Sequence, residues 1–132
     1  MHAIADTHAL IWYLLNDPRL SPAVRAVFTG AAAQSQFIGI PTISIVEVIY
    51  LTEKGRIPQA AFTLLQAQLS NQQTVLQVVP LDETISFRVQ QINRNTVPEM
   101  PDRIIAATAL AYNLPLLSRD HKIQATGLHI IW

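Results

Sequence analysis

Cysteine is absent from the 132-residue sequence. This absence excludes disulfide bonds, zinc sites built from thiolates and cysteine nucleophiles, and it fits a reducing compartment. Any metal ion must therefore be bound through oxygen or imidazole ligands. The length is typical of one domain and is sufficient to bury a hydrophobic core without cross-links, so we expect a single domain over residues 1–132.

Long hydrophobic runs are also missing. Half of the residues are hydrophobic and 14% are charged, but no apolar run approaches the ~18 residues of a membrane span. Residues 1–15 are mostly apolar, yet Asp6 interrupts them and no lysine or arginine precedes them. That pattern differs from a secretory signal. We therefore expect a cytoplasmic protein without a membrane partner.

Neither sign of charge is in excess, because nine Lys and Arg residues balance nine Asp and Glu residues. Proteins that bind nucleic acid usually carry a basic excess. If four of the acids bind cations, however, five acids remain against nine bases, an excess of four positive charges. A phosphate-containing partner is therefore compatible with the composition.

Short apolar segments alternate with longer helical patterns along the chain. Strands are predicted over residues 2–5, 37–40, 75–79, 114–117 and 128–131. Helices are predicted over residues 7–15, 22–33, 44–55, 59–69, 82–93 and 102–112. This alternation implies strand-helix-strand crossovers and a parallel sheet covered on both faces. The sequence therefore predicts an α/β fold, a three-layer α/β/α sandwich with a mostly parallel central sheet of four to five strands.

Four acidic residues lie where predicted strands meet predicted helices: Asp6, Glu47, Asp102 and Asp120. In parallel sheets these turns gather at the carboxyl ends of the strands, where ligands bind. Each acid also stands in an apolar stretch, and burying a lone carboxylate costs several kcal/mol. We therefore expect a bound cation. Oxygen ligands without thiols favour Mg²⁺ or Mn²⁺, which suit phosphoryl chemistry.

A simpler interpretation applies to two of these acids. Asp102 and Glu47 are also predicted near helix starts, where carboxylates cap the helix, and Glu47 has capping-box spacing to Ser44. Asp82 likewise lies between a predicted strand and helix, and we interpret it as a plain cap. Position alone therefore does not select the four acids.

The four acids are distinguished from other acids, such as Asp82, by a resemblance to a known family. Four motifs follow in order: Asp6-Thr7-His8-Ala9-Leu10-Ile11-Trp12; Ser44-x-x-Glu47 followed by Gly55-Arg56-Ile57; Asp102-Arg103-Ile104-Ile105-Ala106-Ala107-Thr108-Ala109; and Leu117-Ser118-Arg119-Asp120. Together they span nearly the whole chain. The chain resembles the PIN domain family, especially the VapC-type toxins of bacterial toxin-antitoxin pairs.

The resemblance implies roles for particular residues. The four metal-site acids of the family fall on Asp6, Glu47, Asp102 and Asp120, and its Ser or Thr two residues before the last acid falls on Ser118. It also implies Mg²⁺- or Mn²⁺-dependent endoribonuclease activity on RNA, inhibition by a cognate antitoxin, and a homodimer.

Two alternatives stay open. A catalytically silent PIN-like module that binds RNA or protein would be marked by the loss of an acid, and none of the four is missing. A phosphotransfer enzyme with Asp6 as the nucleophile would resemble an Asp-x-Asp motif, whereas this chain has Asp6-Thr7-His8.

Several neighbours of these acids are candidates for supporting roles. We assign Thr7, Ser118 and Arg103 to the surroundings of the acids or to substrate contact, and the Ser118 hydroxyl can orient a carboxylate or make a local turn. Arg103 and Arg119 each adjoin a site acid, where a salt bridge or a surface position is favoured over phosphate binding. His8 stands where many family members have Asn, and we favour a structural role for it.

The predicted helix over residues 7–15 is apolar nearly all round. Such a helix is either fully buried or part of an interface. Trp12 and Tyr13 are residue types enriched at interfaces, so we expect them to contribute to a dimer or antitoxin contact.

Overall fold

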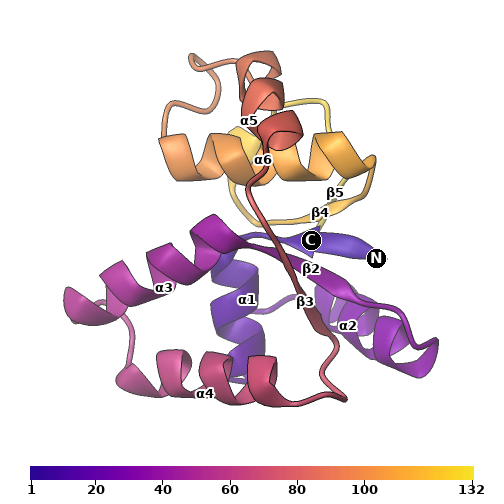
Figure 1. The fold of residues 1–132 in the computed structure, drawn as a ribbon, viewed down its shortest axis with the longest axis vertical. Helices are drawn as coiled ribbons and strands as arrows, with labels where there is room; N and C mark the ends of the chain where they lie inside the picture. Colours follow the sequence, from indigo (N-terminus) through magenta and orange to yellow (C-terminus); the bar gives the residue numbers. More distant parts are fainter.

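The computed structural model describes all 132 residues, Met1 to Trp132, and contains five strands among short and long helices (Figure 1). The elements are β1 (Ala3–Ala5), α1 (Thr7–Leu14), α2 (Pro22–Ala33), β2 (Ile38–Pro41), α3 (Thr42–Glu53), α4 (Gln59–Ser70), β3 (Leu76–Val79), α5 (Glu83–Arg88), the 3₁₀ helix η1 (Val89–Gln91), α6 (Met100–Tyr112), β4 (Leu116–Leu117), α7 (His121–Gln124) and β5 (Ile130–Ile131).

The five strands form one sheet in the order β3-β2-β1-β4-β5. Every neighbouring pair is parallel, so the predicted sheet is confirmed and is parallel throughout. The chain runs outward from β1 to β3 and then returns to the other side of β1 with β4. This reversal creates a topological switch point between β1 and β4, where doubly wound sheets bind ligands at the carboxyl ends of their strands.

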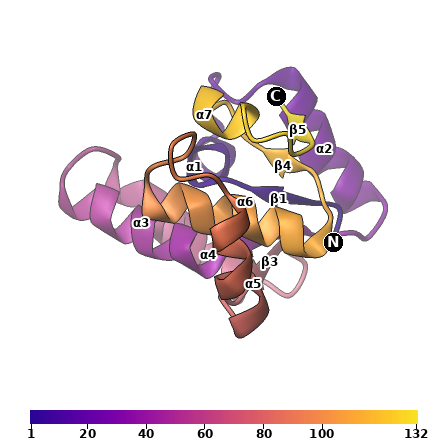
Figure 2. The same cartoon turned by 90° about the horizontal axis from the view of Figure 1, so that it is seen from above.

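Helices cover both faces of the sheet, and the sheet separates two hydrophobic cores (Figures 1 and 2). Side chains alternate along β1: Ala3 and Ala5 belong to the core beneath α1, α2 and α4, whereas Ile4 belongs to the core beneath α5 and α6. All three residues are fully buried, as expected for a strand covered on both faces. The predicted three-layer sandwich is therefore confirmed.

Two helices start earlier than predicted. Helix α3 begins at Thr42, directly after β2, and its N-cap residue Pro41 makes no side-chain capping bond. Ser44 and Glu47 therefore do not form the expected capping box, which is a correction. Helix α6 begins at Met100 with Pro101 in its first turn, a favoured place for proline because the missing N–H would be unpaired there. Asp102 consequently lies inside its helix rather than at the cap.

The region after β3 also differs in detail from the prediction. Asp82 caps α5 as expected, and its Oδ1 accepts a hydrogen bond from the Ile85 amide at 2.8 Å. The expected helix over residues 82–93 ends early, as α5 followed by η1. Helix α7 was not predicted, because four residues with a single buried side chain, Ile123, give no periodicity. None of the helices has the length and apolar character needed to cross a membrane.

Candidate active site

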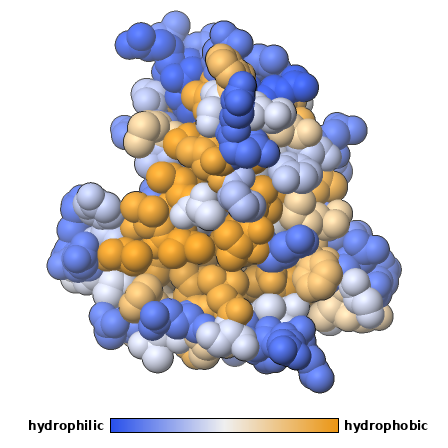
Figure 3. Space-filling view, viewed as in Figure 1, coloured by the Kyte–Doolittle hydropathy of each residue, from blue (hydrophilic) through white to orange (hydrophobic).

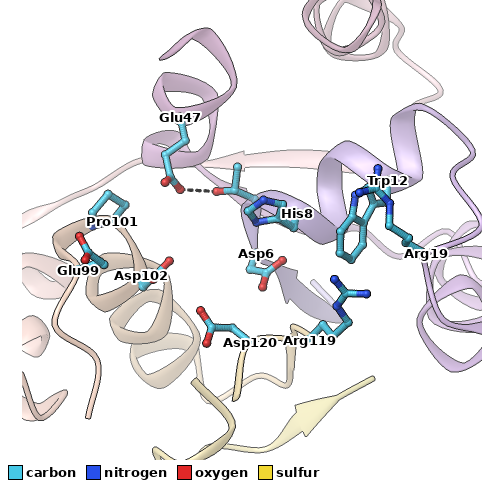
Figure 4. Close-up of a pocket in the computed structure, with 11 residues that line it drawn as sticks. Asp6, His8, Trp12, Arg19, Glu47, Glu99, Pro101, Asp102, Arg119 and Asp120 are labelled. Carbon is cyan, nitrogen blue, oxygen red and sulfur yellow. Dashed lines mark hydrogen bonds between the residues drawn. The ribbon is translucent and has the colours of Figure 1, made fainter. Parts of the chain in front are cut away.

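A pocket of about 510 Å³ opens at the carboxyl ends of β1 and β4, next to the switch point of the sheet (Figure 4). It is lined by Asp6, Thr7, His8, Trp12, Arg19, Glu47, Glu99, Pro101, Asp102, Arg119 and Asp120. All four acids expected from the sequence are among these residues. They come from the end of β1, from α3, from α6 and from the segment after β4, so residues distant in the sequence meet here.

Asp6 is the most buried of the four acids, with 7% of its surface exposed. It caps α1, and its Oδ1 accepts a hydrogen bond from the Ala9 amide at 2.8 Å. Burial raises the pKa of Asp6, and hydrogen bonds from Ser118 and the Ala9 amide and the charge of His8 offset part of that rise. The negative charge of Asp120 raises the pKa further.

Asp102 is half-buried on the first turn of α6. Burial raises the pKa of this carboxyl to about 6, and the negative charges of Asp120, Glu47, Asp6 and Glu99 contribute in that order. The acids are therefore close enough to repel one another. The chain contains one salt bridge, between Arg19 and Asp17, so no basic side chain pairs with the acids of the pocket.

Thr7 connects Glu47 to helix α1. The Thr7 hydroxyl donates a hydrogen bond to the Glu47 carboxylate, drawn as a dashed line in Figure 4, and lies 3.1 Å from the buried Ser44 hydroxyl. Ser44 therefore supports the Thr7–Glu47 contact instead of capping a helix. Thr7 holds the position beside the acids that the sequence suggested.

Ser118 lies between Asp6 and Asp120. Its side chain is fully buried, its hydroxyl lowers the pKa of Asp6, and its Oγ accepts a hydrogen bond from the Asp120 amide at 3.1 Å. Asp120 in turn caps α7, since its Oδ1 accepts from the Lys122 amide at 2.8 Å. One hydroxyl therefore connects the segments that follow two neighbouring strands, β1 and β4.

Arg103 does not reach the pocket, which corrects the expectation that it surrounds the acids or contacts substrate. Its guanidinium donates hydrogen bonds to the carbonyl oxygens of Val89 and Ile92 at 2.9–3.1 Å, and so ties α6 to the preceding segment. The reason is helical geometry, because adjacent residues of an α-helix point about 100° apart. Asp102 faces the pocket, and Arg103 faces away from it.

Three lining residues were missed in the sequence: Glu99, Pro101 and Arg19. Glu99 is the N-cap residue of α6 and precedes Asp102 by three residues, and an acidic residue this close in sequence to a site acid was a signal that could have identified it. Arg19 gives no local signal, since it reaches the pocket from the loop after α1. Of the two positions favoured for Arg119, a salt bridge or the surface, it takes the second: it is exposed, forms no salt bridge with its neighbouring acid, and lies over the ring of Trp12.

The residues present fit a hard divalent cation. No three Asp, Glu or His side chains are gathered closely enough to hold a metal ion as they stand, so binding would draw the carboxylates together. Their chemistry is nevertheless that of a Mg²⁺ or Mn²⁺ site, because the available ligands are carboxylate oxygens and their mutual repulsion lacks a basic partner. Asp6, Asp102 and Asp120, with Glu47, would hold such an ion.

Solved structures of similar fold include two VapBC toxin-antitoxin complexes and FitAcB. The DNA-bound VapBC of Salmonella typhimurium is 21% identical with a TM-score of 0.74, over 99% of this chain and 97% of that one. VapBC2 of Rickettsia felis, bound to a promoter DNA fragment, is 17% identical with a TM-score of 0.73, over 99% and 98%. FitAcB of Neisseria gonorrhoeae is 19% identical with a TM-score of 0.63, over 98% and 96%. At these identities the likeness shows the fold.

No curated protein matches the sequence significantly. The family model described as PIN domain, in contrast, matches residues 3–127. This match includes every acid of the pocket and the strands β1 to β4, and leaves out only the first two residues and the last five, among which β5 lies. Both the sequence profile and the arrangement of the five parallel strands lead to the same assignment: the chain belongs to the PIN domain family.

Proposed function

We propose that the protein is a metal-dependent endoribonuclease that hydrolyses RNA phosphodiester bonds. The observation that carries the proposal is the gathering of Asp6, Glu47, Asp102 and Asp120 around one pocket without a basic partner. Membership of the PIN domain family supports it, because such domains generally act as nucleases. A bound Mg²⁺ or Mn²⁺ would supply positive charge to the phosphate oxygens and acidify a water molecule.

Some residues of the pocket would bind the ion, and others would orient its ligands. Asp6, Asp102 and Asp120 are proposed to bind the principal cation, and Glu47 to complete the site or to help bind a second. Ser118 fixes Asp6 relative to Asp120, and Thr7 fixes Glu47. The carboxylates would act as ligands of the ion and orient the attacking water, while Thr7 and Ser118 limit how far Glu47, Asp6 and Asp120 have to move.

The proposed partner is a cognate antitoxin that inhibits the nuclease in the cytoplasm. This proposal draws on the VapBC structures, which are toxin-antitoxin complexes of similar fold. We also propose a homodimer. Trp12 does not contribute to the proposed dimer surface, because its side chain is buried within the chain. Exposed Val46, Ile49 and Tyr50 share one face of α3, and apolar surface gathers around α3 and β3 in Figure 3.

The test is cleavage of total bacterial RNA by the purified protein, with single-stranded DNA as a comparison substrate. Mg²⁺ or Mn²⁺ should support cleavage and EDTA should abolish it. Asp102→Asn removes one charge from the acids while keeping the side-chain shape, so the rate should fall by orders of magnitude with an unchanged circular dichroism spectrum. Equal cleavage in EDTA would refute the metal mechanism. RNA binding without cleavage would favour the silent module.

A further inference from the structure

The pocket has a second wall that is cationic and aromatic. It consists of His8, Trp12, Arg19 and Arg119, which lie together on the side away from Glu47, Glu99 and Asp102 (Figure 4). Trp12 and His8 belong to α1, Arg19 to the loop after it, and Arg119 to the segment after β4. The acidic residues explain metal binding, but they leave this wall without a function.

Trp12 is the centre of this wall. Its ring is almost fully buried, with the Arg119 guanidinium carbon 4.6 Å and the Arg19 guanidinium carbon 5.0 Å from the ring centroid. The rings of Trp132 and His8 pack against it, each with centroids 5.6 Å away. Cation–π contacts within 6 Å are attractive. Trp12 therefore places two positive charges on the rim of the pocket.

The two arginines differ in how much of their charge is engaged. Arg19 pairs with Asp17, through Nη2 to Oδ2 at 2.8 Å and Nε to Oδ1 at 3.1 Å, which fixes its guanidinium over the ring. Arg119 is exposed and forms no hydrogen bond or ion pair through its side chain. All its N–H donors are available to a ligand that carries negative charge.

The two arginines do not serve to neutralise the acids. His8, Ser118 and the Ala9 amide lower the pKa of Asp6, whereas neither arginine contributes to that shift or to that of Asp102. Glu47, Glu99 and Asp102 therefore lie apart from the arginines, with Asp6 and Asp120 between the two groups (Figure 4). A ligand that spans the pocket must present one anionic group to the acid-bound cation and another to the arginines.

We propose that Arg119, held on Trp12 and assisted by Arg19, binds a backbone phosphate of the substrate strand adjacent to the linkage that is cleaved. The proposal rests on the proposed nuclease function. A nucleic-acid strand carries phosphates at regular intervals, so one phosphate at the metal side places its neighbour along the pocket. Arginine suits this contact because its planar donors match phosphate oxygens. Trp12 acts as a positioning residue.

The experiment measures binding of a short fluorescein-labelled single-stranded RNA of mixed sequence by anisotropy, at several salt concentrations. Ca²⁺ replaces Mg²⁺ to suppress cleavage, and a gel checks that the RNA stays intact. Arg119→Ala should weaken binding about five- to tenfold and make the slope of log K against log salt shallower by about 0.7, the value for one lost contact to a single strand. Arg119→Lys should retain most of the slope.

Arg56→Ala is the matched control, because Arg56 is an exposed arginine just beyond the far end of α3, outside the pocket. It should leave affinity and slope near wild-type values. Trp12→Phe should weaken binding in the wild-type background and have no further effect beside Arg119→Ala, since a positioning role depends on the arginine. Additive effects would show that Trp12 serves stability alone.

The proposal fails if Arg119→Ala binds RNA as Arg56→Ala does, or if the wild type does not bind the RNA. Binding of a polyglutamate peptide in place of RNA would overturn it and assign the arginines to an acidic protein partner. Metal-dependent cleavage with unchanged RNA binding by Arg119→Ala would reject the subsite and keep the nuclease. RNA binding that depends on Arg119, without cleavage by the wild type, would keep the phosphate subsite and reject the nuclease.

Discussion

Asp6 and Asp82 have the same local structure in different parts of the sheet. Each follows a parallel strand and caps the next helix, and each accepts a hydrogen bond at 2.8 Å from the amide three residues later. Asp6 is buried beside Ser118 and Asp120, whereas Asp82 is exposed and lies outside the pocket. The same local motif therefore forms part of a candidate site in one place and a simple cap in the other.

The difference follows from strand order. Asp6 ends β1, which lies between β2 and β4, so the segments after both neighbouring strands bring side chains towards it. Asp82 follows β3, which lies at the edge of the sheet. Strand β3 has a single neighbour, β2, and the chain leaves the end of β2 directly into α3. Convergence at the switch point, rather than the chemistry of the capping aspartate, creates the acidic pocket.

The largest expected difference between Asp6 and Asp82 is in catalysis. Asp6→Asn and Asp82→Asn both preserve a capping oxygen, because Asn caps about as well as Asp. We expect Asp6→Asn to reduce metal-dependent RNA cleavage by orders of magnitude and Asp82→Asn to leave it within twofold. Initial rates on the same RNA, with circular dichroism as the control for folding, measure this. Comparable losses in both variants would mean that a helix start, and not the pocket, matters.

The architecture could be predicted from the sequence because it depends on local patterns. Fully apolar segments such as Ala3-Ile4-Ala5 indicate buried parallel strands, and the helices between them imply crossovers. The convergence of four acids was also predictable, but only with the family resemblance, since Asp82 satisfies the same positional rule. Helix starts were displaced where a proline, Pro41 or Pro101, led the chain into its helix.

The remainder of the site depends on side-chain direction and on contacts between distant residues. Arg103 and Arg119 look equivalent in sequence, because each adjoins a site acid. The first bonds to backbone carbonyl groups outside the pocket, and the second lies on Trp12 inside it. Trp12 is separated from Arg119 by more than a hundred residues, so no local pattern links them. Such contacts emerge only from the assembled fold.

A second, intermediate test compares the response of the two regions to metal. A divalent ion that binds only the native state should stabilise it by about 2.7 kcal/mol at a hundredfold excess over Kd, seen as a higher melting temperature. Asp82→Asn should show the full Mn²⁺ response, because Asp82 lies outside the pocket. Asp102→Asn should be as stable as wild type or more stable in EDTA, because it relieves repulsion, and should respond less to Mn²⁺. An undiminished Mn²⁺ response in Asp102→Asn would remove it from the ligands.

The smallest expected effect is the pH dependence of stability in the absence of metal. Burial, with the charges of Asp120 and Glu47 next in importance, raises the pKa of Asp102 from its usual 3.8 to about 6 in the folded protein. Between these pH values the folded protein keeps a proton that the unfolded chain releases. This contribution to stability is therefore complete below about pH 4 and is lost as pH rises through about 6.

Urea unfolding in EDTA across this range should consequently show that wild type loses stability relative to Asp102→Asn as pH increases, and that the difference levels off above about pH 6. The effect should be smaller than the metal response, since Asp102 is only half-buried and water screens its charge. Asp6 also has a raised pKa, so the variant should retain a residual slope of the same sign. A stability difference that stays constant from about pH 4 to 7 would mean that Asp102 carries its charge as freely as an exposed carboxylate. In that case the repulsion among the acids would be too weak to distinguish the end of β1 from the end of β3.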